Sequence, residues 1–204
     1  MTTNSLAVRW GDGRRADTDF AREQILDAAW RCYEANTVYK TSMEHIAREA
    51  KVSRTTVYRY FENRDEVLTG VVMRALHQLI DQIRNDVVET DNFGEFVVEA
   101  LVRGVKAVPK SAVFSLMLQE QSTVISRVYI ASPKTLSILI DFFSDRFELA
   151  KRAGELRDGV ELLPMIDWLI HAVSAYMLAP TSMQSADDWR KMLRMFLVPA
   201  LVRD

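Results

Sequence analysis

The chain has 204 residues, 49% hydrophobic and 26% charged, a composition typical of globular proteins that excludes a wholly disordered chain. Its 26 basic and 28 acidic residues leave a formal charge of −2, so any contact with nucleic acid must come from a local patch. The lone cysteine, Cys32, excludes an intramolecular disulfide. The N-terminus has no apolar signal core, and we expect a cytoplasmic protein.

Apolar residues recur at intervals of three and four along the chain, while glycine and proline are scarce, which predicts an all-α fold of about nine helices. Residues 1–18 are polar and aperiodic and should form a flexible N-terminal arm. A first helix is predicted over 19–34, with Asn36 in the left-handed conformation that ends many helices. Thr41 and Glu44 have the spacing of a capping box, with Thr41 as the N-cap of a short second helix.

A tight turn at 51–52 follows, and Ser53 should cap a third helix that ends near Tyr60. Two short helices joined in this way over residues 42–60 are typical of a helix-turn-helix. A long helix with a continuous apolar stripe is then predicted from Arg64 to Thr90. Basic residues outnumber acidic ones between residues 40 and 64, so the chain is locally basic here.

The predicted third helix carries side chains suited to DNA. Val57 and Phe61 are four residues apart and should face the core, which turns the polar side chains outward. Arginine binds guanine through two hydrogen bonds, threonine contacts base edges, and tyrosine hydroxyls bind phosphate. The outward residues are Arg54, Thr55, Thr56, Tyr58, Arg59 and Tyr60. A charged face is more commonly just solvated, but outward tyrosines beside arginines favour an interface.

Residues 22–72 resemble the DNA-binding domain of the TetR (tetracycline-repressor) family of bacterial regulators. The resemblance rests on ILDAA at 25–29, TSMEHIA at 41–47, VSRTTVYRYF at 52–61 and NRDEVL at 63–68. It implies base contacts by Arg54, Thr55, Thr56 and Arg59, and phosphate contacts by Ser42, Tyr58, Tyr60 and Arg64, and we add the two predicted cap residues Thr41 and Ser53.

The chain departs from the family pattern at Lys51, where members of the family usually have glycine, and at Asn36, where they often have it. A lysine at positive φ costs on the order of 1 kcal/mol. The resemblance assigns DNA binding to residues 19–63 and ligand binding and dimerisation to 64–204. It implies a repressor that leaves a palindromic operator when a small-molecule effector tilts the long helix.

The remaining helices are predicted near 92–107, 109–130, 133–153, 161–179 and 186–202. Large apolar residues on these helices are candidates for the wall of a ligand pocket, which would suit an apolar effector, and each is also a candidate for plain core. The pocket candidates are Phe96, Phe114, Met117, Leu118, Tyr129, Phe142, Phe143, Phe147, Trp168 and His171, with His171 and Gln121 as polar anchors.

The last two predicted helices carry more apolar residues than one face can hold, which indicates an interface between two copies of the chain. The alternative is that neighbouring helices cover both. The candidate interface residues are Ile166, Leu169, Ile170, Val173, Trp189, Met192, Leu193 and Phe196.

Other functions fit less well. The three histidines have no metal-ligand spacing, there is no glycine-rich phosphate loop, and we expect no metal, no cofactor and no catalytic site. The balanced charge argues against a protein that compacts DNA non-specifically. The apolar stretch 162–179 contains Pro164, Asp167 and His171, which argues against a membrane span. The alternative that the chain is a ligand sensor acting on a protein partner instead of DNA remains compatible with the sequence.

Overall fold

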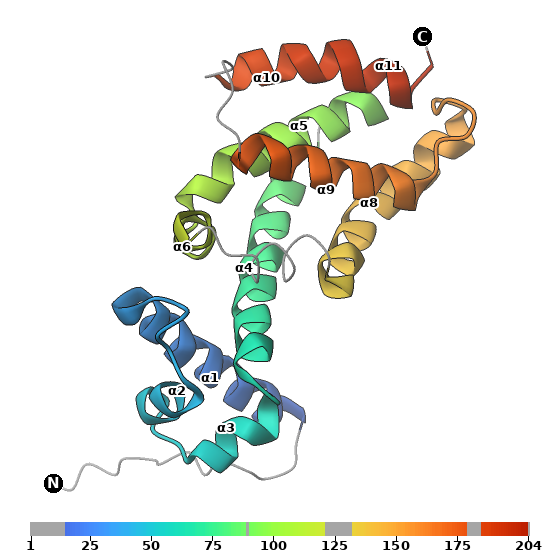
Figure 1. Ribbon diagram of the computed structural model, residues 1–204. Helices are drawn as coiled ribbons and strands as arrows, with labels where there is room; N and C mark the ends of the chain where they lie inside the picture. The colour runs from blue at the N-terminus through green and yellow to red at the C-terminus, as the bar shows by residue number, and fades with distance from the viewer. Residues whose placement is uncertain (1–14, 89, 121–131, 179–184, 204) are drawn as a thin grey trace, which may run out of the picture. The chain divides into compact units, whose positions relative to one another are not determined.

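The structure, a computed structural model, describes residues 15–88, 90–120, 132–178 and 185–203, with side chains for all of these except 15–17, 117–120 and 177–178. Its elements are helical throughout these ranges apart from one isolated bridge between Leu156 and Val202, which confirms the predicted all-α fold. The chain forms two compact units, an N-terminal unit (Met1–Val71) and a C-terminal unit (Val72–Asp204), and passes from one to the other within α4, Arg64–Asp86 (Figure 1).

The N-terminal unit contains α1 (Arg15–Asn36), α2 (Met43–Glu49), α3 (Arg54–Tyr60) and the first turns of α4. Its core is built on side chains with no exposed surface, among them Ile25, Ile46, Val57, Phe61 and Val67.

The first helix is longer at both ends than the predicted range 19–34, and the predicted cap at Asn36 is wrong. Asn36 is the last helical residue, and Thr37 takes the left-handed conformation with φ 84°. The predicted arm loses its last residues to α1, while residues 1–14 lie outside the described part of the chain.

The predicted apolar stripe of α4 is confirmed, because each of its members is buried: Val67, Leu68, Val71, Val72, Ala75, Leu76, Leu79, Ile83 and Val87. The helix ends at Asp86, earlier than predicted. Arg146 of α8 (Pro133–Ala153) contacts the chain just beyond that end, with Nη2 3.4 Å from the carbonyl oxygen of Val87 and 2.7 Å from Thr90 Oγ1. A cation beside the last carbonyls of a helix is a favourable arrangement.

The C-terminal unit continues with α5 (Phe93–Ala107), α6 (Ala112–Glu120), α8 and α9 (Leu162–Leu178). A last helical run comprises α10 (Ala186–Met192), a π-helical turn (Leu193–Leu197) and α11 (Val198–Leu201). This run packs along α5, as Figure 1 shows. These bounds match four of the five predicted ranges. The fifth, 109–130, is wrong in its first residues, which form a 3-10 turn at Val108–Lys110, and residues 121–131 are not described.

Aromatic rings from α5 and α8 form the centre of the C-terminal unit. Phe96 lies with its ring centroid 5.4 Å from that of Phe142 and 5.7 Å from that of Phe143, and Phe93 lies 5.7 Å from Phe147. All five rings are buried. The first pair is stacked and the other two are edge-on, and aromatic rings favour offset-stacked and edge-on arrangements.

Two ion pairs join α5 to the last helical run. Arg190 holds the carboxylate of Glu99 through two hydrogen bonds of 2.5 and 3.1 Å, and Arg103 contacts the same carboxylate. One turn earlier, Glu95 accepts two hydrogen bonds from Arg194 in a more exposed position. The hydrogen bond from Arg190 lowers the pKa of Glu99 below its ordinary value.

Replacing Glu99 with glutamine should lower the free energy of unfolding by about 1–3 kcal/mol, because the change weakens a charge-assisted pair that is largely shielded from water. Glu95→Gln, the same change in an exposed pair, should cost less than about 1 kcal/mol. The pKa of Glu99 is lower in the folded than in the unfolded chain. Its contribution to the free energy of unfolding is therefore complete above the ordinary glutamate pKa of 4.5 and is lost as the pH falls below that value. Urea unfolding at pH 7 and pH 4 measures the free energy of unfolding of both variants. Equal losses of stability for Glu99→Gln and Glu95→Gln, or a loss for Glu99→Gln that does not depend on pH, would contradict this prediction.

Candidate nucleic-acid interface

The second helix begins one residue later than its sequence pattern predicts. Ser42, not Thr41, is the N-cap of α2, and its hydroxyl accepts a hydrogen bond of 3.2 Å from the backbone N–H of His45. The His45 ring completes the capping box by accepting from the N–H of Ser42, so the role predicted for Glu44 is also wrong. Ser42 remains exposed at the surface.

The side chain of Thr41 is buried beneath the surface. Its side chain is 1% exposed, and its hydroxyl donates to the carbonyl oxygens of Thr37 at 2.8 Å and Cys32 at 3.3 Å. The hydroxyl thereby fastens the segment before α2 to the end of α1. Our prediction that Thr41 binds DNA is therefore wrong. Burial also raises the pKa of the neighbouring Cys32 thiol, which makes it less reactive.

The turn between α2 and α3 has the geometry that the sequence predicts. Lys51 has a φ of 57°, and the N–H of Val52 donates to the carbonyl oxygen of Ala47 at 3.0 Å. A side chain in this left-handed region is strained, and glycine is the residue that adopts it without cost.

Replacing Lys51 with glycine should therefore stabilise the N-terminal unit by about 0.5–1 kcal/mol, even though glycine adds freedom to the unfolded chain. Lys51→Ala removes the same charge and keeps the strain, so it should leave stability unchanged or lower it. Thermal unfolding of the three proteins separates the two effects. Equal stability of the glycine and alanine variants would show that strain at this residue is not the cause.

The recognition helix α3 presents an apolar face to the core. Val57 and Phe61 have no exposed surface, as predicted. Ser53 caps the helix by accepting from the N–H of Thr56 at 3.1 Å, and its hydroxyl lies 2.8 Å from the Thr56 hydroxyl. Arg22 of α1 holds the other end, donating to the carbonyl oxygen of Tyr60 at 3.1 Å with its guanidinium 4.2 Å from the Phe61 ring centroid.

The opposite face of α3 carries the residues predicted to contact DNA. Arg54, Thr55, Tyr58 and Arg59 are exposed, and Tyr60 is half-buried. Each arginine is paired with a tyrosine: Arg54 donates to the hydroxyl of Tyr58 at 3.3 Å, and Arg59 donates to the hydroxyl of Tyr60 at 3.1 Å. Hydrogen bonding to Tyr58 raises the pKa of Arg54. These pairs place two cations and two aromatic rings on one surface.

A depression beside α3 adds two residues that our sequence reasoning missed, Tyr39 and Lys40. They line it together with Ser42, Arg54 and Tyr58, and Tyr39 is half exposed. Arg64 lies at the same depression and fixes the Tyr39 carbonyl through a hydrogen bond of 2.9 Å. In the sequence these two residues form an aromatic–basic pair directly before Thr41. A shallow basic depression with hydroxyl groups suits a phosphate.

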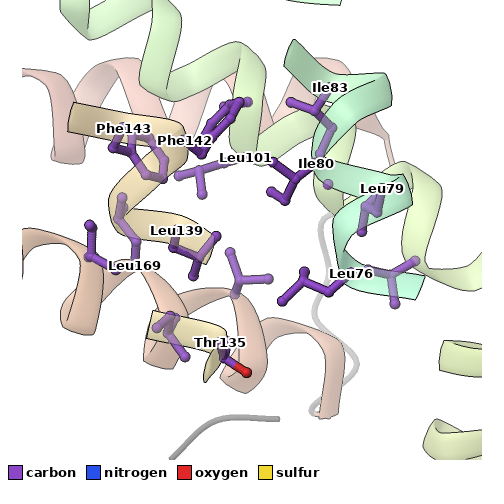
Figure 2. A pocket seen from close by; sticks show the side chains of 16 residues that line it. Leu76, Leu79, Ile80, Ile83, Leu101, Thr135, Leu139, Phe142, Phe143 and Leu169 are labelled. Atoms are coloured by element: carbon purple, nitrogen blue, oxygen red, sulfur yellow. The ribbon is translucent and has the colours of Figure 1, made fainter. Parts of the chain in front are cut away.

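The C-terminal unit contains an apolar pocket of about 80 Å³. Phe142 and Phe143, two of the pocket candidates, line it, and Figure 2 shows them with leucine and isoleucine side chains around the space. Phe96, Phe114 and Phe147 are buried but lie in the core outside this lining. The sequence reasoning missed α4 as a wall, since its apolar stripe looked like ordinary core. The lining residues are Leu76, Leu79, Ile80, Ile83, Ala100, Leu101, Gly104, Val108, Thr135, Leu139, Phe142, Phe143, Ile166, Leu169, Ile170 and Val173.

Other predicted pocket residues do not reach this space. Trp168 is 55% exposed, and the exposed ring of His171 lies 2.7 Å from the carbonyl oxygen of Asp167 on its own helix, so neither residue lines this pocket. The side chains of Met117 and Leu118, and the whole of Tyr129 and Gln121, lie outside the described residues.

A second apolar depression lies at the surface between α9 and the last helical run. It is lined by aromatic residues that include Trp168, Tyr176 and Phe196. Phe196 is 72% exposed and its neighbour Met195 67%.

Most residues predicted for the dimer interface point into the C-terminal unit instead. Ile166, Leu169, Ile170, Trp189 and Leu193 are buried within a single chain, so they cannot be the surface on which a second copy packs. Val173 and Met192 are half-buried, and only Phe196 of the predicted set is well exposed. Helical periodicity therefore selected residues that the single chain itself buries.

Among the described residues, no three histidine, cysteine, aspartate or glutamate side chains gather as metal ligands. No described helix is both long and apolar enough to cross a membrane.

Comparisons with known proteins agree with this geometry. A family model described as bacterial regulatory proteins of the tetR family matches residues 25–71, which span α2, α3 and the turn between them. An uncharacterised HTH-type transcriptional regulator of Mycobacterium tuberculosis is 29% identical over 176 residues, covering 85% of this chain and 84% of that protein. Another from Haemophilus influenzae is 37% identical over 82 residues, 40% of this chain. That match spans less than half of the curated relative, 43% of its length.

Among solved structures, the transcriptional repressor QsdR of R. erythropolis, from the TetR family, has the same fold. The two structures align with a TM-score of 0.66 at 19% identity, covering 92% of this chain and 98% of the QsdR chain. The similarity therefore extends through both units, beyond the segment that the family model matches.

Proposed function

Because the chain belongs to the TetR family of bacterial regulatory proteins, we propose that it represses transcription from a palindromic operator, which it binds as a homodimer and leaves when a small, largely apolar effector binds. As a regulator of this family it acts by binding DNA and is not an enzyme. The observation that carries the proposal is the two-faced recognition helix, with Val57 and Phe61 fully buried and Arg54, Tyr58 and Arg59 exposed on the other side.

The recognition helix fits the size and chemistry of a major groove. Its seven residues give a length of about 10 Å, against a groove about 12 Å wide. Arg54, Thr55 and Arg59 are free to meet base edges, while Tyr58, Ser42 and the depression around Lys40 supply phosphate contacts. In this proposal the arginine–tyrosine hydrogen bonds hold the guanidinium groups near their binding positions before DNA arrives.

A homodimer follows from the exposed aromatic surface of α9 and the last helical run. Trp168, Met195 and Phe196 are each more than half exposed, and a monomer would leave them in water. A two-fold dimer buries the same surface on both chains and presents two recognition helices to the two halves of a palindrome. The dimer contacts therefore lie on these exposed residues in place of the buried ones that the sequence suggested.

Effector binding acts on α4. The pocket of about 80 Å³ is small beside the 300–1,000 Å³ of typical ligand sites, so an effector has to move part of the lining to enter. Four lining residues, Leu76, Leu79, Ile80 and Ile83, belong to α4, whose first turns are part of the DNA-binding unit. An effector that binds better when α4 is displaced shifts the population away from the DNA-binding state.

A salt-dependent binding titration tests the proposal, with the DNA flanking the protein's own gene against a scrambled duplex. We expect a palindromic fragment to bind about a thousandfold more tightly than the scrambled control, with a steep dependence on salt. Equal, weak binding of both duplexes, repeated with duplexes selected from a random pool, would contradict DNA recognition and favour a sensor that acts on a protein partner.

A further inference from the structure

Among the described residues that line the pocket of the C-terminal unit, one has a polar side chain. Of the residues that line it, Thr135 carries a hydroxyl, and the rest offer hydrocarbon or aromatic surface or are glycine. Thr135 is 1% exposed. A buried hydroxyl normally bonds a strong acceptor, because an unsatisfied polar group is costly in an apolar interior.

The Thr135 hydroxyl has only a weak partner in the described part of the chain. It donates to the thioether sulfur of Met73 at 3.7 Å, and thioether sulfur is a poor acceptor. A carbonyl or hydroxyl oxygen would be a better one. The methionine side chain is flexible, so it can move aside when such an oxygen approaches.

Charged groups near the pocket are engaged elsewhere. The guanidinium of Arg84 lies 5.8 Å from the ring centroid of Phe142, but it pairs with Asp141 at 2.8 Å in an exposed position. Arg103 pairs with Glu99 and Asp86. No ionisable side chain is among the lining residues that the structure describes, so a charged ligand would lose its hydration without gaining a counter-ion from them.

The lining is also elongated. It follows α4 from Leu76 to Ile83 for about 10 Å and α8 from Thr135 to Phe143 for about 12 Å. Figure 2 shows Thr135 on the side of Leu76, whereas Phe142 and Phe143 lie toward Ile83. The polar group therefore lies at one end of a space that is otherwise lined by hydrocarbon.

We propose that the pocket takes an uncharged ligand with a hydrocarbon body about 10 Å long and one hydroxyl or carbonyl oxygen at its end, which bonds to Thr135 in place of Met73. This inference rests on the proposed function, because it specifies the effector of the same site. Thr135 is the residue that fixes the direction in which the ligand lies.

Calorimetric titration of the full chain at pH 7.5 with 1-octanol, octanoate and octylammonium tests the charge requirement. These probes share one chain length and differ in charge. We expect 1-octanol to bind at least about tenfold more tightly than either ion, because burying an unpaired charge is far more costly than burying a hydroxyl. Equal or tighter binding of either ion would overturn the proposal of an uncharged ligand.

Two variants test the role of Thr135. Thr135→Val keeps the shape and removes the hydroxyl, so it should weaken 1-octanol binding about fivefold and leave the binding of propylbenzene, a probe without a polar atom, unchanged. Thr135→Ser restores a hydroxyl and should bind 1-octanol like the native protein. If Thr135→Val weakened the binding of 1-octanol and propylbenzene equally, the cause would be altered packing, and the proposed hydrogen bond between Thr135 and the ligand would be overturned.

Operator binding, measured on the same samples, separates this inference from the proposed function. A chain that binds its operator but none of the probes overturns the ligand proposal and leaves the regulator intact. A chain that discriminates among the probes as expected, yet binds no DNA specifically, supports the pocket and contradicts the proposed repressor.

Discussion

Replacing Arg59 with alanine should weaken operator binding about a hundredfold at 0.15 M salt and leave the fold unchanged. Arg59 is exposed on the outer face of α3, where it contacts the hydroxyl and the ring of Tyr60. An arginine that binds a base through two hydrogen bonds contributes about 1–3 kcal/mol, and the proposed dimer uses two copies of it on each operator. Fluorescence anisotropy with labelled operator measures the loss.

Arg31→Ala is a matched control for this prediction. It removes the same charge from the N-terminal unit, and its exposed ion pair with Glu49, at 2.6 Å, contributes little to stability. Operator affinity should fall less than about threefold in this variant, as expected for a distant surface charge. If Arg59→Ala bound DNA as tightly as the control, α3 would not be the helix that contacts the bases of the operator.

The N-terminal unit was largely predictable from the sequence because its signals are local. The burial of Val57 and Phe61 follows from their spacing, and the positive φ of Lys51 follows from the tight turn. The error at Thr41 is instructive, since Thr41 and Ser42 are both good capping residues and adjacent in the chain. Which of them caps α2 depends on the Cys32 and Thr37 carbonyls, which bind the Thr41 hydroxyl from another element.

The C-terminal unit was less predictable because several of its helices are apolar on more than one face. The sequence of α9 does not say which of Ile166 and Trp168 is inside, and the structure buries the first and exposes the second. The pocket depends on contacts among four helices that are distant in the chain, and α4 contributes a wall that periodicity alone assigns to the core. The spacing of apolar residues predicts that a segment is helical, whereas its packing partners decide which of its faces is buried, exposed or lines a pocket.

A second large effect is expected at the dimer surface, where Phe196→Asp should convert the protein to a monomer at 10 μM. Phe196 is 72% exposed, so the substitution should leave the folded chain intact. In the proposed two-fold interface the change buries two unpaired carboxylates, one from each chain, and an uncompensated buried charge costs several kcal/mol. A monomer reaches one half-site only, so operator affinity should also fall at least about a hundredfold.

Leu149→Asp provides the control for this second effect, because Leu149 is an exposed apolar residue of α8 that does not line the α9 depression. Sedimentation velocity of the three proteins should give a dimer for the native chain and for Leu149→Asp, and a single chain for Phe196→Asp. A native protein that sediments as one chain would contradict the dimer itself. A Phe196→Asp variant that stays dimeric would place the interface on another face. In a two-fold contact centred on Phe196, the new carboxylates of both chains would face each other, and their burial would break the dimer.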